Sequence, residues 1–134
     1  MDFANQMNLL YSDLTYKIRG AIFTVYNHLG FGHKEIVYQK ALAREFGERS
    51  IPFEREKALG VIYKNENIGV YRPDFVVDEK IILEIKAVEF IPMSFENQII
   101  HYLKSTGYTV GLLANFGSKK IYIKRLVWTA SHPR

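Results

Sequence analysis

The sequence predicts a single mixed α/β domain in which helices pack on a central β-sheet. Apolar residues recur at helical spacing in two segments near the N-terminus and in one near residue 100. Residues 53–90 and 108–128 instead contain short β-branched and aromatic runs that turn residues separate. The 134 residues are enough for one hydrophobic core, and a hydrophobic content of 48% is too high for a disordered chain.

Two helices are predicted before the first strand. The first covers residues 12–29, with Ser12 or Asp13 as the expected N-cap. Gly30 follows directly, and glycine readily adopts the left-handed conformation that ends many helices. The second helix covers residues 34–47, where aromatic and aliphatic residues are four positions apart.

Three strands are expected in the middle of the chain, over residues 53–65, 68–77 and 81–90. Turns at residues 66–67 and 78–80 separate them. We therefore predict a three-stranded antiparallel meander.

A third helix and two strands complete the domain. The helix covers residues 95–106, with Ser94 as the expected N-cap and Gly107 at its end. The strands cover residues 108–116 and 119–128, which gives the order ααβββαββ for one domain over residues 1–134. Residues 129–134 are expected to be frayed.

Composition excludes several classes of site. The chain has no cysteine, which excludes disulfides, thiolate zinc sites and cysteine nucleophiles. No apolar run approaches the roughly 20 residues of a membrane span, and the N-terminus does not resemble a signal peptide, so we expect a cytoplasmic protein without a membrane association. The net charge of +4 is compatible with a polyanionic partner and equally with ordinary solubility.

The hairpin around residues 78–80 brings candidate catalytic groups together. If its turn is centred on Glu79, Asp74 lies directly opposite Glu84 on the neighbouring strand. Lys86 is two residues beyond Glu84 and points to the same face. A shift of the register by one residue would separate them.

Apolar neighbours surround these two carboxylates on both strands. Buried carboxylates are costly unless they are paired or bind a metal, and a single lysine leaves this group net negative. A hard divalent cation such as Mg²⁺ would balance the charge. The alternative is an ordinary ion pair between Lys86 and one of the acids on an edge strand.

Four segments together resemble a known family. They are Arg72-Pro73-Asp74 with Glu84-Ile85-Lys86, Gly32-His33-Lys34-Glu35-Ile36-Val37-Tyr38, Gln98-Ile99-Ile100-His101-Tyr102, and the closing runs GLLANFG and KRLVW. The first pair resembles the PD-(D/E)XK nuclease signature, and the second matches the pattern that names the GxxExxY proteins, a bacterial group assigned to that superfamily. The resemblance spans about residues 12–128 and implies a restriction-endonuclease-like fold.

The resemblance also implies roles for individual residues. Asp74 and Glu84 would bind Mg²⁺ or Mn²⁺ with the backbone carbonyl of Ile85. Lys86 would orient the attacking water and stabilise charge on the phosphate. Glu35 would add a carboxylate to the metal site or orient its waters.

Gln98 and Tyr102, which are one helical turn apart, would position the phosphate or the catalytic lysine according to the same resemblance. An exposed amide and a half-buried ring without function are the alternative for this pair.

The implied function is metal-dependent hydrolysis of nucleic-acid phosphodiester bonds, with DNA favoured over RNA. Two alternatives stay open. One is a catalytically silent nuclease-like module that binds nucleic acid or a protein partner. The other is a glycosidase with Asp74 and Glu84 as its acid pair, which Lys86 and the single tryptophan, Trp128, disfavour. The oligomeric state is open, with a homodimer as one expectation.

Overall fold

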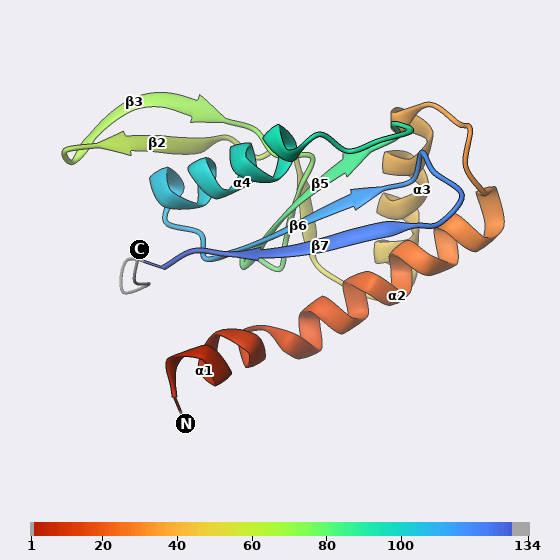
Figure 1. Cartoon of the computed structure of the whole chain (residues 1–134), viewed down its shortest axis with the longest axis horizontal. Helices are drawn as coiled ribbons and strands as arrows, with labels where there is room; N and C mark the ends of the chain where they lie inside the picture. Colours follow the sequence, from red (N-terminus) through yellow and green to blue (C-terminus); the bar gives the residue numbers. More distant parts are fainter. Residues whose placement is uncertain (1, 130–134) are drawn as a thin grey trace.

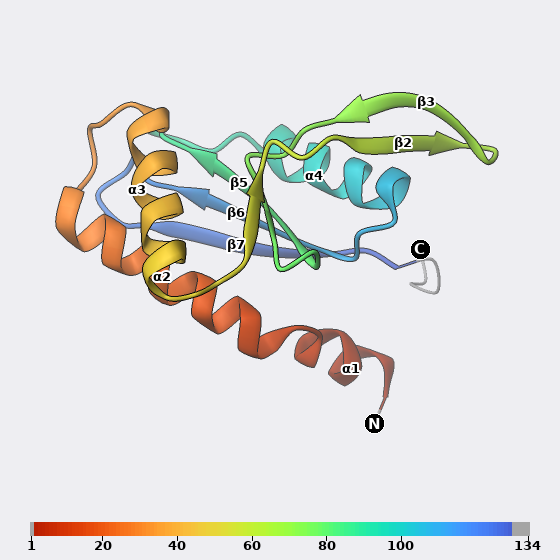
Figure 2. The same cartoon turned by 180° about the vertical axis from the view of Figure 1, so that it is seen from behind.

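A five-stranded mixed β-sheet with helices on both faces forms the centre of the structure, a computed structural model that describes residues 2–129. Helix α4 covers one face (Figure 1), and α2 and α3 cover the other (Figure 2). The helices are α1 (Phe3–Leu9), α2 (Ser12–Leu29), α3 (Glu35–Glu48) and α4 (Met93–Thr106). The predicted mixed α/β class is confirmed.

The strand order of the main sheet is β1-β4-β5-β6-β7. Its strands are β1 (Phe53–Arg55), β4 (Phe75–Val77), β5 (Ile81–Lys86), β6 (Val110–Asn115) and β7 (Tyr122–Val127). Only β5 and β6 run parallel, and α4 makes the crossover between them. The other neighbouring strands are antiparallel.

The prediction of a three-stranded antiparallel meander in the middle of the chain is wrong, because this region contains more strands and they belong to two sheets. The segment 53–65 divides into β1 and β2 (Leu59–Tyr63), because the backbone at Glu56 turns with a φ of 53°. The segment 68–77 divides into β3 (Glu66–Tyr71) and β4, since Pro73 lies between them and has no N–H for a ladder. Strands β2 and β3 form a separate hairpin beside α4 (Figure 1).

The turn of this separate hairpin is also shifted from the predicted residues 66–67. Lys64 and Asn65 occupy the turn with φ values of 47° and 66°. Positive φ at both central residues matches the twist of antiparallel strands, and asparagine tolerates it better than most residues.

Helix boundaries agree better with the sequence than helix caps do. Helix α2 covers the predicted residues 12–29 and ends at Gly30, with a φ of 66°. Its N-cap is Tyr11 in a left-handed conformation, without a side-chain hydrogen bond, so Ser12 and Asp13 as caps were wrong. Tyr11 makes a sharp corner after α1, a helix that the sequence did not predict.

Helix α4 ends at Gly107, with a φ of 84°, as predicted. It begins at Met93, two residues before the predicted start, because Pro92 is the N-cap and has no N–H to lose. The predicted cap at Ser94 is therefore wrong.

Alternating side chains divide the core between the two faces of the sheet. Leu83 and Ile85 of β5 pack with α2 and α3, whereas Ile82 packs with α4. Glu84 lies between Leu83 and Ile85, so it points to the α4 face. The described helices include none that is long and apolar enough to cross a membrane. Of the tail that was expected to be frayed, residues 130–134 lie outside the described part.

Candidate active site

The β4–β5 hairpin has the register that the site requires. Phe75 pairs with Leu83 and Val77 with Ile81, so the turn is centred on Glu79 as predicted. The ladder stops at Phe75, and Asp74 and Glu84 occupy the next opposed positions, where the two strands open.

Hydrogen bonds across the hairpin hold the two carboxylates in place. Asp74 Oδ2 accepts from the backbone N–H of Ile85 at 2.7 Å, and Glu84 Oε1 accepts from the N–H of Asp74 at 3.1 Å. Each acid thus bonds to the opposite strand, which fixes both side chains at the open end of the ladder. The second oxygen of each carboxylate has no hydrogen bond within residues 2–129.

Burial makes both carboxylates reluctant to ionise. Burial raises the pKa of Glu84 to about 7, and the nearby Asp74 charge raises it further. The hydrogen bonds from Tyr71 and from the Asp74 N–H have the opposite effect and lower this pKa. Burial also raises the pKa of Asp74. The hydrogen bond from the Ile85 N–H and the charges of Lys86 and Arg55 lower this pKa in part. Near neutral pH, the positive charge around Asp74 and Glu84 is therefore too small to keep both carboxylates readily ionised.

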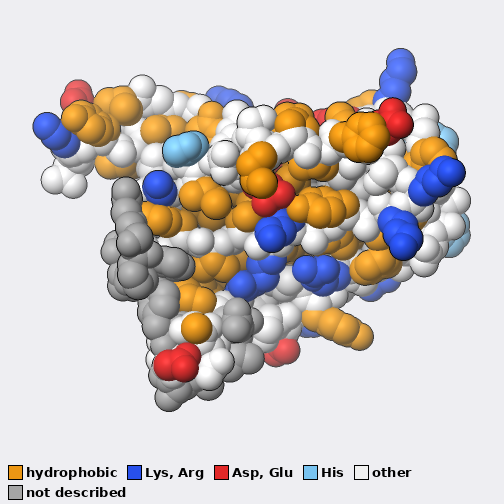
Figure 3. All heavy atoms as spheres, in the orientation of Figure 1, with side chains coloured by type: hydrophobic (Ala, Val, Ile, Leu, Met, Phe, Trp, Pro, Cys, Tyr) orange, Lys and Arg blue, Asp and Glu red, His pale blue; other side chains and the backbone are white. Residues whose placement is uncertain are grey.

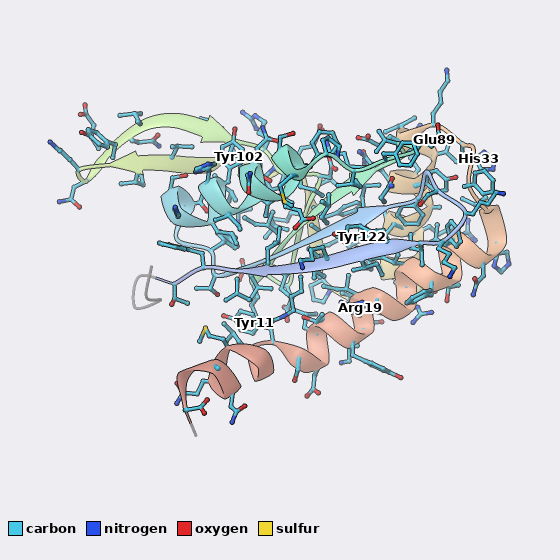
Figure 4. The ribbon with its side chains drawn as sticks, in the orientation of Figure 1. Tyr11, Arg19, His33, Glu89, Tyr102 and Tyr122 are labelled. Atoms are coloured by element: carbon cyan, nitrogen blue, oxygen red, sulfur yellow. The ribbon has the colours of Figure 1, made fainter. Side chains whose placement is uncertain are left out.

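Tyr102 reaches the site through a second tyrosine. Its ring stacks on Tyr71 with centroids 3.7 Å apart and planes 1° from parallel. Tyr71 donates its hydroxyl to Glu84 Oε1 at 2.8 Å. Figure 4 shows Tyr102 between α4 and the β2–β3 hairpin, the element that ends in Tyr71.

A small cleft beside Glu84 contains Lys86 and Gln98. Phe95, Ile99 and Leu113 complete most of its lining. The Lys86 ammonium lies 4.7 Å from the centre of the Phe95 ring, within the range of a cation–π contact. Gln98 is exposed at the mouth, so its amide is free to meet a ligand.

The loop before α3 delivers Glu35 to this end of the sheet. The buried Tyr38 hydroxyl donates to the Gly30 carbonyl at 2.6 Å and accepts from the His33 N–H at 3.2 Å. Gly32 has a φ of 106°, which favours glycine. These contacts give a structural reason for the spacing of Gly32, Glu35 and Tyr38.

Glu35 lies in the electrostatic environment of the pair. Burial raises the pKa of its carboxyl, Lys86 opposes this rise and Asp74 adds to it. Within residues 2–129, however, no group of three Asp, Glu, His or Cys side chains is close enough to hold a metal ion. The structure therefore brings Glu35 into the electrostatic range of Asp74 and Lys86 without forming a complete three-carboxylate cluster.

The donor set at the hairpin fits a hard divalent cation. Asp74 and Glu84 each have one carboxylate oxygen without a hydrogen bond, and Ile85 has a backbone carbonyl between Glu84 and Lys86. Carboxylate, carbonyl and water oxygens suit Mg²⁺ and Mn²⁺. A cation there would also offset the burial and the Asp74 charge, which together raise the Glu84 pKa.

Several residues at the site were missed from the sequence. Tyr71 bonds to Glu84, and Gln39 and Arg55 form hydrogen bonds that lead to Glu35. Gln39 carried a signal, because it is four residues after Glu35 on one helix face. Tyr71 and Arg55 carried none, since their places depend on how separate strands meet.

Asn115 also supports the site, although residues 115–117 resemble only a hairpin turn in the sequence. Its side chain is 2% exposed and bonds to both the N–H and the carbonyl of Val88. This clamps the loop that leaves β5 after Lys86. His33 packs edge-on against Tyr38, and its N–H donates to the Tyr38 hydroxyl, which indicates a structural role in the loop before α3.

Comparison with known proteins identifies a family. A family model described as the PD-(D/E)XK nuclease superfamily matches residues 12–126. No curated protein and no solved structure matches the chain.

Proposed function

Because the chain belongs to the PD-(D/E)XK nuclease superfamily, we propose that it hydrolyses nucleic-acid phosphodiester bonds with a divalent cation held by Asp74 and Glu84. The observation that carries this proposal is the pair of carboxylates at the open end of the β4–β5 ladder, each bonded to the opposite strand. DNA is the expected substrate, and the GxxExxY proteins are the branch that the chain resembles. A cytoplasmic location, a bacterial source and a homodimer stay predictions.

Each residue has a role that follows from its position. When bound, the cation supplies positive charge against the phosphate and makes an attacking water more acidic. Lys86 adds a second positive charge beside the same cleft, where charge develops on the phosphate. Gln98 offers an amide at the mouth, and Tyr102 acts through Tyr71 on the orientation of Glu84.

Charge on the face that carries α4 supports a polyanionic substrate. Figure 3 shows Lys and Arg side chains over β7 and the loop before it on this face. Lys119 and Lys120 in the loop before β7 and Lys124 in β7 are exposed. Arg125 follows Lys124 in β7, points to the opposite face of the sheet and bonds to the carbonyls of Met7 and Leu10, so it is a structural contact.

A cleavage assay with matched variants tests the proposal. The protein is incubated with Mg²⁺ or Mn²⁺ and with single-stranded DNA, duplex DNA or RNA. Asp74→Asn should abolish cleavage, whereas Asp78→Asn should retain it, because Asp78 lies in the turn of the same hairpin and pairs with Lys80. Lys86→Met and Lys80→Met form a second matched pair.

One alternative is a catalytically silent module that binds nucleic acid or a protein partner. Equal activity of the wild type and Asp74→Asn would refute the enzyme. Binding of DNA without cleavage, unchanged by Mn²⁺, would support the silent module.

A further inference from the structure

A chain of two hydrogen bonds connects strand β1 with Glu35 on helix α3. Arg55 Nη2 donates to Gln39 Oε1 at 2.7 Å, and Gln39 Nε2 donates to Glu35 Oε1 in a longer bond of 3.4 Å. Arg55 pairs with Phe75, the residue that follows Asp74. The two elements that carry Glu35 and Asp74 are thus joined through Gln39 and Arg55.

The chemistry of the groups fixes the direction of this chain. A guanidinium only donates hydrogen bonds, so the amide of Gln39 must turn its oxygen toward Arg55. The N–H groups of the amide then face the other way, where the Glu35 carboxylate accepts. If the amide were reversed, its oxygen would meet a carboxylate and its N–H groups would meet a cation.

The Arg55 side chain packs against other groups of the protein. Its guanidinium lies 5.4 Å from the centre of the Phe75 ring, and its Nε is buried without a hydrogen-bond partner. The bond to Gln39 is therefore the polar contact through which Arg55 can influence the site, apart from its charge near Asp74.

We propose that Arg55 and Gln39 are positioning residues that hold the Glu35 carboxylate toward Asp74 and Lys86. This inference rests on the proposed function, since the direction of Glu35 matters to a cation at the hairpin acids. The competing explanation is that the bond between Arg55 and Gln39 merely ties α3 to β1. Under that explanation, the consequences of replacing Gln39 would not depend on whether Glu35 is present.

The first test uses the metal-free protein. The side-chain amide signals of Gln39 in a ¹⁵N–¹H NMR spectrum are identified by their loss in Gln39→Met. They should shift in Arg55→Met and also in Glu35→Gln, whereas Arg44→Met should leave them unchanged, because Arg44 is an 83% exposed side chain on the same helix. Signals that stay in place in the first two variants would overturn the inference, whether or not the protein binds a metal.

The second test measures Mn²⁺ affinity in a double-mutant cycle, with free Mn²⁺ followed by electron paramagnetic resonance. Gln39→Met should weaken binding about 10-fold, as expected for a group that orients a ligand. In a Glu35→Gln background the same change should alter affinity by less than about twofold, because the residue through which it acts is gone. Thermal unfolding without metal checks that each variant is folded.

The outcomes separate this inference from the proposed function. An equal loss of affinity from Gln39→Met in both backgrounds, or no loss in the wild type, would overturn the positioning role and leave the nuclease intact. A wild type that binds no Mn²⁺ and cleaves nothing would refute the nuclease, and the NMR shifts would still decide whether Arg55 and Gln39 orient Glu35.

Discussion

Replacing Glu84 with glutamine should stabilise the metal-free protein above pH 7 and change its stability little below pH 4.5. The carboxyl has a pKa of about 7 in the folded chain, against an ordinary value of 4.5. Because the folded-state pKa is raised, the folded protein binds this proton more tightly than the unfolded chain does. The contribution of this proton to the free energy of unfolding is fully present below pH 4.5 and is lost as the pH rises through 7.

The magnitude follows from the difference between the two values. At about 1.4 kcal/mol for each pH unit, a rise from 4.5 to about 7 corresponds to a loss of about 3 kcal/mol above pH 7. Glutamine keeps an oxygen that can accept from the Asp74 N–H and Tyr71 but carries no charge. A change of this size is a large part of the roughly 5–15 kcal/mol that stabilises a typical domain.

Urea denaturation in EDTA from pH 4.5 to 8.5 measures the free energy of unfolding for the wild type and E84Q. Their difference should grow with pH, and Glu66→Gln, at an exposed position of the β2–β3 hairpin, serves as the control. Saturating Mn²⁺ should stabilise the wild type far more than E84Q. A difference that stays constant over this pH range would refute the reasoning, because Glu84 would then be no more costly to ionise than in the unfolded chain.

Three further predictions concern the surroundings of the pair. Tyr102→Phe should keep Mn²⁺ affinity and activity, and Tyr102→Ala should lower both by removing a stack worth about 1 kcal/mol, measured by titration and cleavage assay. Mn²⁺ binding at pH 7 should release about half a proton from Glu84, which calorimetry in buffers of different ionisation enthalpy detects; no release would contradict the raised pKa. Gly117→Ala should destabilise the protein by about 3 kcal/mol or more, because the added Cβ would overlap the backbone of Val88, and thermal unfolding tests this.

The register of the β4–β5 hairpin could be predicted because local chemistry determines it. Asp78 and Glu79 accept positive φ values of 50° and 56° in a short turn, and apolar runs begin directly on either side of that turn, at Val77 and Ile81. These two constraints place Asp74 opposite Glu84 without any knowledge of the rest of the fold. The end of α2 at Gly30 could be predicted for the same reason, since glycine there acts locally.

Features that depend on contacts between distant segments could not be predicted. The residues near Tyr11 do not mark it as the position before a helix. The end of α1 that precedes it is bonded to Arg125, which is more than 100 residues away in the sequence. Strand β1 extends for only three residues before the chain leaves the sheet, so a continuous strand over 53–65 was the simpler interpretation. Arg55 meets Gln39 only because β1 returns to pair with β4.

The place where the ladder opens explains how this hairpin can hold two buried acids at all. Beyond Phe75 the strands exchange no further ladder bonds, and the N–H groups of Asp74 and Ile85 turn to the carboxylates instead. Each acid therefore uses one oxygen to satisfy the backbone and keeps the other oxygen unbonded. A cation that takes the two remaining oxygens needs to break none of these bonds, so the arrangement that maintains the fold without metal is also the arrangement that would receive it.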